Sequence, residues 1–174
     1  MAGLERRPGA PEWLILTGGC GFILILALSA AWEADIRWLH FFQAWMYLAT
    51  IVLSLRGSRW GWFIGISAAG LWDYATVFAN GFLKSGLSEL GKWMHSGQLA
   101  RPDLLIVVPA WAFNLLVVIG AIWAYSLRPG KTRGDVGRAL VAFALTTGFF
   151  AADMAIFQPR YLVIFPRLLH PQPW

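Results

Sequence analysis

Long apolar segments constrain this chain more than any other feature of its sequence. A helix that crosses the hydrocarbon core of a bilayer needs roughly 17–25 predominantly apolar residues. Five segments meet that requirement, at residues 13–32, 38–55, 60–83, 104–127 and 139–157. Each is too long and too uniformly apolar for an alternating barrel strand. The sequence therefore predicts an all-α, polytopic membrane protein, with five transmembrane helices forming a single bundle over residues 1–174.

The composition favours the same class of protein. Hydrophobic residues make up 58% of the chain and charged residues 13%, against about 45–50% and about 25% in soluble domains. Many of the 11 Trp residues lie near the ends of the apolar segments, as in the aromatic belt of a membrane interface. The net charge of +5 comes from basic residues in short connections, which argues against nucleic acid as a partner. The partner that the sequence indicates is the lipid bilayer.

Two further segments are too polar or too interrupted to cross a membrane. In residues 84–103, Leu87, Leu90 and Met94 share one helical face, which predicts a short helix on the membrane surface. The C-terminal tail, residues 159–174, contains four prolines, which do not allow a regular sixth crossing. We expect this tail to lie at the outer interface.

The basic residues also predict the orientation, because short cytoplasmic connections are enriched in Lys and Arg. With the N-terminus inside, the inner connections contain Arg6, Arg7, Arg56, Arg59, Arg128, Lys131, Arg133 and Arg138, and the outer ones Arg37, Lys84, Lys92 and Arg101. The sequence thus predicts a multi-pass protein of a bacterial-type inner (plasma) membrane. Its N-terminus would be cytoplasmic and its C-terminus outside.

Two carboxylates lie within the apolar segments. Asp73 is 14 residues after Arg59, and Asp153 is 15 residues after Arg138. At about 1.5 Å per residue both are roughly 20 Å from the inner surface, in the outer half of a core about 30 Å thick. An ionisable residue at that depth is costly and by default indicates function.

Other polar residues recur at helical spacing, so that they form stripes that must face other helices or a wet cavity. The stripes are His40, Gln43, Tyr47, Thr50 and Ser54; Asp73, Thr76, Asn80 and Lys84; and Thr146, Asp153 and Arg160. We expect them to build a pocket that opens to the outer side. Its predicted binding or proton-coupling residues are Asp73, Asp153, His40, Gln43, Tyr47, Asn80 and Asn114.

A purely structural interpretation is also open. Amide and hydroxyl side chains commonly join transmembrane helices by hydrogen bonds. The aspartates could form ion pairs that only stabilise the fold, Asp73 with Lys84 and Asp153 with Arg160. In the inner half, the small residues Gly61, Gly65 and Ala69 recur at a spacing of four and predict a tightly packed floor.

No catalytic signature accompanies these residues. The sequence has no Cys/His cluster at zinc spacing, no nucleophile elbow and no phosphate loop. We therefore assign no metal, cofactor or catalytic residue. The favoured function is binding or carriage of a small amphipathic or cationic molecule, with proton coupling through paired aspartates as an option.

Two alternatives remain open. One is a membrane-embedded enzyme that uses Asp/His acid–base chemistry on a lipid or isoprenoid-like substrate. The other is an accessory subunit of a larger membrane complex. A homo-oligomer is compatible with each of these functions.

Overall fold

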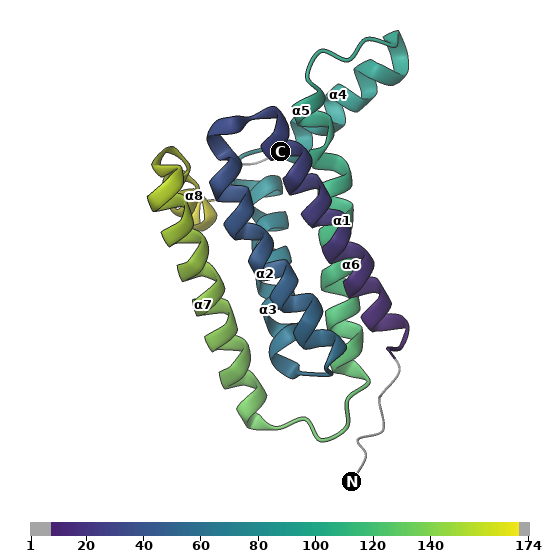
Figure 1. Ribbon diagram of the computed structural model, residues 1–174, viewed down its shortest axis with the longest axis vertical. Helices are drawn as coiled ribbons and strands as arrows, with labels where there is room; N and C mark the ends of the chain where they lie inside the picture. The colour runs from purple at the N-terminus through teal and green to yellow at the C-terminus, as the bar shows by residue number, and fades with distance from the viewer. Residues whose placement is uncertain (1–7, 171–174) are drawn as a thin grey trace.

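The computed structural model describes residues 8–170, which are almost entirely helical and contain no strand (Figure 1). The main helices are α1 (Ala10–Trp32), α2 (Arg37–Leu55), α3 (Arg59–Tyr74), α4 (Phe82–Ser96), α6 (Val107–Ser126) and α7 (Arg133–Phe157). Shorter elements are η1 (Ala34–Ile36), the π-helix η2 (Ala75–Ala79), α5 (Pro102–Leu105), η3 (Pro159–Val163) and α8 (Ile164–Leu169). Four helices are long and apolar enough to cross a membrane: α1, α2 with η1, α6 with α5, and α7. The predicted all-helical class is thereby confirmed, with four helices that could cross a membrane.

The third predicted apolar helix, residues 60–83, ends earlier in the structure than the sequence predicts. The helix ends four residues early, at Ala79, because Asn80 and Gly81 break it. Gly81 has φ +65°, a left-handed conformation that glycine adopts without steric cost. The Asn80 side-chain oxygen accepts a hydrogen bond from the N–H of Phe82 at 3.0 Å. Leu83 therefore belongs to α4, and the prediction that it ends the third apolar helix is wrong.

Helix α7 begins at Arg133, six residues before the predicted start of its apolar segment. A capping box explains the difference. The backbone N–H of Thr132 donates to Asp135 Oδ2 at 3.0 Å, and Asp135 is the third residue of the helix. This reciprocal cap satisfies backbone donors that the first turn would otherwise leave free.

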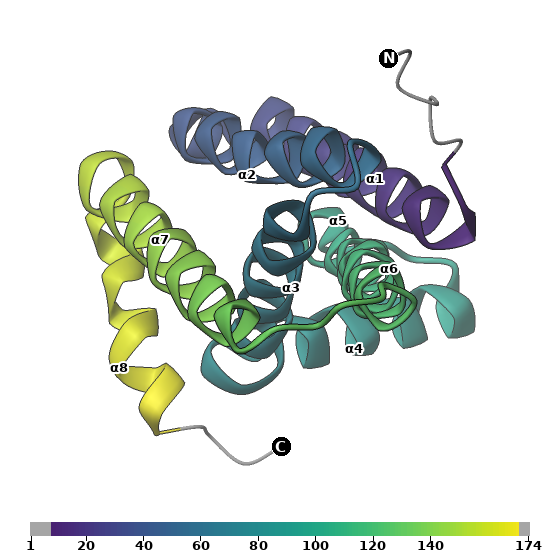
Figure 2. The same cartoon turned by 90° about the horizontal axis from the view of Figure 1, so that it is seen from below.

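Helix α3 occupies the middle of the bundle. It packs against α2, α6 and α7, and α1 packs against α2 and α6 (Figure 2). Two helix pairs approach very closely. A Cβ added at Gly18 of α1 would lie 2.5 Å from the Phe113 carbonyl oxygen, and one at Gly61 of α3 would lie 2.5 Å from the Ser54 nitrogen. The predicted close packing at Gly61, Gly65 and Ala69 is confirmed, because all three are buried.

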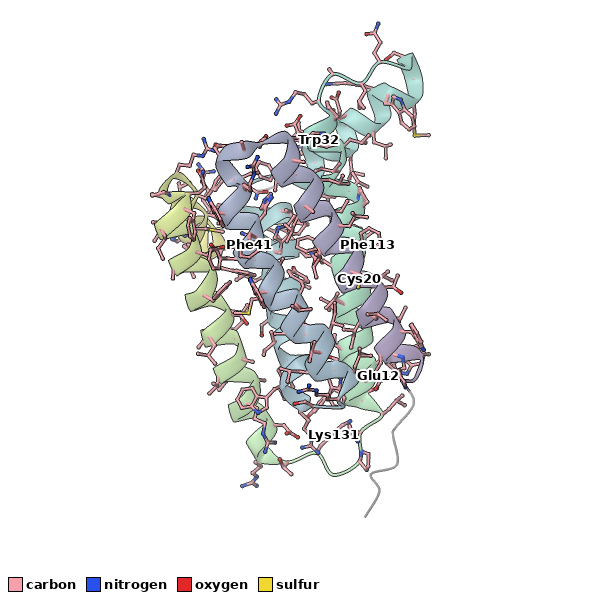
Figure 3. The ribbon with its side chains drawn as sticks, viewed as in Figure 1. Glu12, Cys20, Trp32, Phe41, Phe113 and Lys131 are labelled. Carbon is pink, nitrogen blue, oxygen red and sulfur yellow. The ribbon has the colours of Figure 1, made fainter. Side chains whose placement is uncertain are left out.

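The two ends of the bundle are built differently. We call one the α1–α2 end; it carries the α1–α2 connection, α4 and α8, with Trp32 marking it in Figure 3. The other is the α2–α3 end, which carries the α2–α3 and α6–α7 connections, with Lys131 in the latter.

Charged side chains join the two connections at the α2–α3 end. Nη1 of Arg59 donates to both carboxylate oxygens of Asp135 at 2.8 and 2.7 Å, and Arg138 Nη1 donates to Oδ1 at 2.6 Å. Nη2 of Arg59 also donates to the Gly130 carbonyl at 2.8 Å. Arg128 donates to the Gly57 carbonyl at 2.6 Å. These bonds tie the α2–α3 and α6–α7 connections together.

The two segments predicted to lie outside the spans are largely helical. Helix α4 leaves the bundle at the α1–α2 end and exposes Leu87, Trp93 and Met94 (Figure 1). After α7, the chain forms η3 and then α8, which contacts η2. The Tyr74 hydroxyl donates to the Leu168 carbonyl at 3.2 Å. The rest of the predicted tail, residues 171–174, lies outside the described residues.

Candidate functional site

A cavity of about 360 Å³ lies at the α1–α2 end of the bundle. It is bounded by α1, α2, α3 with η2, the α5–α6 segment, α7 and α8. Most of its wall is apolar and includes Phe22, Leu26, Leu71, Trp72, Phe150 and Phe165. Apolar walls with a few placed polar groups are typical of sites for small organic molecules.

Three of the seven predicted site residues line this cavity. His40 and Gln43 reach it from α2, and Asn80 reaches it from the break after η2. Thr76 also lines it, but the Thr76 hydroxyl hydrogen-bonds to the backbone carbonyls of Trp72 and Asp73 at 2.9 and 3.0 Å. Two members of each of these two stripes thus meet at the cavity, His40 with Gln43 and Thr76 with Asn80, and the other members do not line it.

Three other predicted residues form a buried polar cluster that does not line the cavity. They are Tyr47 of α2, Asp73 of α3 and Asn114 of α6, and all three are buried. The Asn114 side chain lies near those of Asp73 and Tyr47, although none of the three side chains makes a hydrogen bond of ordinary geometry within residues 8–170. Phe22, which lines the cavity, packs on Tyr47 with ring centroids 4.4 Å apart. Phe22 therefore lies between Tyr47 and the cavity.

Asp153 lies on α7 and is also buried. The cavity is lined by its near neighbours Phe150 and Met154 but not by Asp153 itself. Within the described part of the chain, neither carboxylate oxygen of Asp153 or Asp73 has a hydrogen-bond partner, so the two groups share no proton-mediated contact there. Their predicted proton-coupling role stays a prediction.

The ion pairs considered for the two aspartates do not form. Lys84 lies on α4, beyond the break at Gly81, and is exposed. It is therefore not on the stripe of Asp73. Arg160 lies in η3 and pairs instead with Asp35 in the α1–α2 connection. The side-chain amide of Gln158 donates to the backbone carbonyl of the same Asp35 at 2.5 Å, so this connection is fixed to the end of α7.

The cavity rim carries three charged residues that the sequence-based prediction missed: Glu33, Arg101 and Asp103. Nε and Nη2 of Arg101 donate to Asp103 Oδ1 and Oδ2 at 2.9 and 2.6 Å. Glu33 lies within electrostatic range of Arg101 but forms no ion pair among the described residues. The rim thus has two carboxylates and one guanidinium. A usable signal existed, since each residue lies just outside an apolar segment at the predicted outer side.

The loop that supplies Arg101 is held by Glu89 of α4. Glu89 Oε1 accepts the backbone N–H groups of Ala100 and Arg101 at 2.8 and 2.9 Å, and Lys92 Nζ lies 3.5 Å from Oε2. The N–H of Arg101 is the main cause of a lowered pKa at Glu89, to which Ala100 and Lys92 also contribute. An ionised Glu89 therefore fixes one side of the cavity mouth.

No three His, Cys, Asp or Glu side chains converge within residues 8–170 in a way that could hold a metal ion. The chemistry available at the cavity is apolar contact, hydrogen bonding from His40, Gln43 and Asn80, and charge at the rim. This arrangement can bind an amphipathic molecule with its apolar part inside and its head at the rim.

The chain matches no protein-family model, no curated protein and no solved structure. The class that the structure defines is a helical bundle with several candidate membrane spans. Its function has to be argued from the cavity.

Proposed function

We propose that this protein crosses the membrane five times, with α3 and η2 as the crossing that lies between α2 and α4. These two elements cover residues 59–79, about 30 Å of helix and close to the thickness of a hydrocarbon core. Their position at the centre of the other four helices supports this count. Helix α4 and the C-terminal tail then lie at the interface of the α1–α2 end.

The same arrangement supports the proposed orientation. Arg56, Arg59, Arg128, Lys131 and Arg133 all lie at the α2–α3 end, and basic connections favour the cytoplasmic side. Arg6 and Arg7, which contribute to this argument, lie outside the described residues. The α2–α3 end is thus cytoplasmic in a bacterial-type inner membrane, and the cavity opens outward.

The function proposed for the cavity is binding of a small amphipathic molecule with a cationic head. The observation that supports it is the combination of an apolar wall with a rim that has one more carboxylate than guanidinium. An apolar body gains free energy when it leaves water for such a wall. Glu33 is the rim carboxylate without an ion pair among the described residues, so it is the group available to a ligand cation.

Three short probes with the same six-carbon body test this proposal: hexyltrimethylammonium, hexanesulfonate and hexanol. The protein is held in lipid nanodiscs, and empty nanodiscs correct for partitioning. A saturable change in Trp emission reports binding, because Trp72 lines the cavity. We expect the cation to bind more tightly than the other two. Equal affinity for hexanesulfonate, or no saturable binding of the cation, would contradict the proposal.

A matched pair of variants assigns the charge effect to the rim. Glu33→Gln removes the available rim carboxylate and is expected to weaken binding of the cation about fivefold, or about 1 kcal/mol, as for a solvent-accessible charge pair. Asp35→Asn removes a carboxylate two residues away that pairs with Arg160 and does not line the cavity. It is expected to leave the affinity unchanged.

Carriage of the ligand with a proton is a further step of the same proposal and depends on Asp73 and Asp153. Both are buried without a hydrogen-bond partner in residues 8–170, and buried carboxylates are the usual proton carriers of transporters. In proteoliposomes, an imposed pH gradient should drive uptake of the cationic probe. Asp73→Asn should abolish uptake while leaving equilibrium binding intact, because Asp73 does not line the cavity.

A further inference from the structure

A second hollow lies outside the bundle core, on the lateral surface between α1 and α2. It has a volume of about 680 Å³ and almost entirely apolar walls. On α2 it follows one face through Phe41, Ala44, Trp45 and Leu48, with Phe41 visible on the upper half of α2 in Figure 3. On α1 it follows Ile23, Leu26, Ala27, Ala30 and Ala31. We call it the α1–α2 groove.

The sequence explains why a hollow forms there. The α1 side of the groove consists largely of alanines, whose short side chains cannot fill the space between the helices. The α2 side carries Phe41 and Trp45, which are 50% and 53% exposed and stand out as walls. Both helices are candidate membrane spans. The groove therefore faces the bilayer, and a lipid is the molecule available to fill it.

The length of the groove matches one leaflet. Its α2 wall runs from Arg37, the first residue of α2, to Leu48. These residues are 11 positions apart, about 16 Å along the helix, and the whole hydrocarbon core is about 30 Å thick. One acyl chain of a lipid in the leaflet at the α1–α2 end thus spans the groove from mouth to floor.

The mouth of the groove carries a free positive charge. Arg37 lines the mouth and is exposed, and its guanidinium makes no hydrogen bond or ion pair with the rest of residues 8–170. By contrast, Arg101 and Arg160 at the same end are paired with Asp103 and Asp35. Trp32 and Trp38 lie near Arg37 in sequence and are exposed, as expected at a membrane interface. A guanidinium at headgroup level is well suited to a phosphate, which it can bind with two parallel hydrogen bonds.

We propose that the α1–α2 groove is a binding site for an anionic phospholipid. One acyl chain lies along Ala27, Ala30 and Trp45, and Arg37 binds the phosphodiester of the headgroup. This lipid site is separate from the cavity and prefers a ligand of the opposite charge. The cavity rim is acidic, whereas the mouth of the groove is basic. Leu26 and His40 line both hollows, so a bound lipid covers the outside of the cavity wall.

Native mass spectrometry of the full chain tests this proposal. The protein is released from nanodiscs that contain equal amounts of phosphatidylglycerol and phosphatidylcholine with identical acyl chains. We expect the phosphatidylglycerol adduct to dominate. Both lipids carry the phosphodiester, but the trimethylammonium group of phosphatidylcholine is repelled by a nearby guanidinium, whereas phosphatidylglycerol keeps a net negative charge. Arg37→Gln should therefore lower the ratio of the two adducts about tenfold, or about 1.4 kcal/mol. Arg167→Gln, which changes another exposed arginine at the same end, should leave the ratio unchanged.

A second pair of variants tests the acyl-chain part of the site. Ala27→Phe fills the groove at an exposed position and should reduce retention of phosphatidylglycerol while Arg37 is intact. Ala112→Phe adds the same ring to an exposed position of α6 outside the groove. It should leave retention of phosphatidylglycerol unchanged. Equal retention of the two lipids by the unmodified protein, or an adduct ratio unaffected by Arg37→Gln, would overturn the proposal. If Ala27→Phe does not fold, the Arg37→Gln comparison alone decides it.

Discussion

The two ends of the bundle differ in where their charged groups gather: around one buried carboxylate at the α2–α3 end, and around the mouth of a cavity at the α1–α2 end. At the α2–α3 end, Asp135 receives hydrogen bonds from Arg59, Arg138 and the Thr132 backbone. At the α1–α2 end, a cavity penetrates the bundle, and Glu33 and Arg37 have no ion pair within residues 8–170. The comparison teaches that one end fixes the helices relative to one another.

The largest effect on stability is expected from a substitution at the tightest helix contact of the α2–α3 end. Gly61→Ala places a methyl group 2.5 Å from the Ser54 nitrogen, and such overpacking costs about 1–3 kcal/mol. Gly70→Ala is the matched control on the same helix, because a methyl group there meets nothing within 4 Å. It is expected to stabilise α3 by up to about 1 kcal/mol, since Ala is a better helix former.

Reversible unfolding followed by circular dichroism measures both variants. A Gly61→Ala protein as stable as Gly70→Ala would show that the α2–α3 end is not tightly packed. The contrast between the two ends would then lose its basis.

A smaller effect on stability is expected when a carboxylate that pairs with arginine is neutralised at either end. Asp135→Asn removes the charge that two guanidinium groups share and should lower the unfolding temperature. Asp103→Asn removes the partner of Arg101 at the partly exposed rim. It should change the unfolding temperature less, because exposed ion pairs contribute little to stability. It should also weaken binding of the cationic probe, which Asp135→Asn should leave intact. The account would be contradicted if Asp103→Asn lowered the unfolding temperature more than Asp135→Asn, or if Asp135→Asn weakened binding of the cationic probe and Asp103→Asn did not.

The smallest effect concerns the cavity mouth and depends on pH. The pKa of Glu89 is lowered chiefly by the Arg101 N–H. The ionised form therefore stabilises the loop above the ordinary pKa of a glutamic acid, and this stabilisation is lost as the pH falls through the lowered value. The amide resonances of Ala100 and Arg101 should titrate together with a midpoint below 4.5, the ordinary value. Glu89→Gln should abolish that titration. A midpoint at or above the ordinary value would be inconsistent with the contact.

Four of the five predicted spans are found as long apolar helices, because hydropathy and length are local properties of the chain. The break at Asn80 and Gly81 was missed because the surrounding residues remain apolar and helical spacing continues through it. That error also placed Lys84 on the stripe of Asp73. A conformation with positive φ at one glycine was enough to redirect α4.

The site was predictable only in part, because helical spacing relates neighbouring residues of one helix but not residues that are far apart in the sequence. Helical spacing placed His40 and Gln43 on the face that lines the cavity. It could not show that Asp35 pairs with Arg160, 125 residues away, or that Arg59 pairs with Asp135, 76 residues away. Nor could it show that Phe22 separates Tyr47 from the cavity, because that depends on how α1 packs on α2.

Thiol accessibility at two positions of α2 tests the difference between the ends most directly. Gln43 and Ser54 lie on one buried face, but only Gln43 lines the cavity. Single-cysteine variants Gln43→Cys and Ser54→Cys, made in a Cys20→Ala background, are treated in nanodiscs with a small cationic thiosulfonate. Both membrane faces are then exposed to the reagent. The account predicts rapid modification at position 43, slowed by hexyltrimethylammonium, and none at position 54. Equal modification at the two positions, or faster modification at position 54, would contradict it.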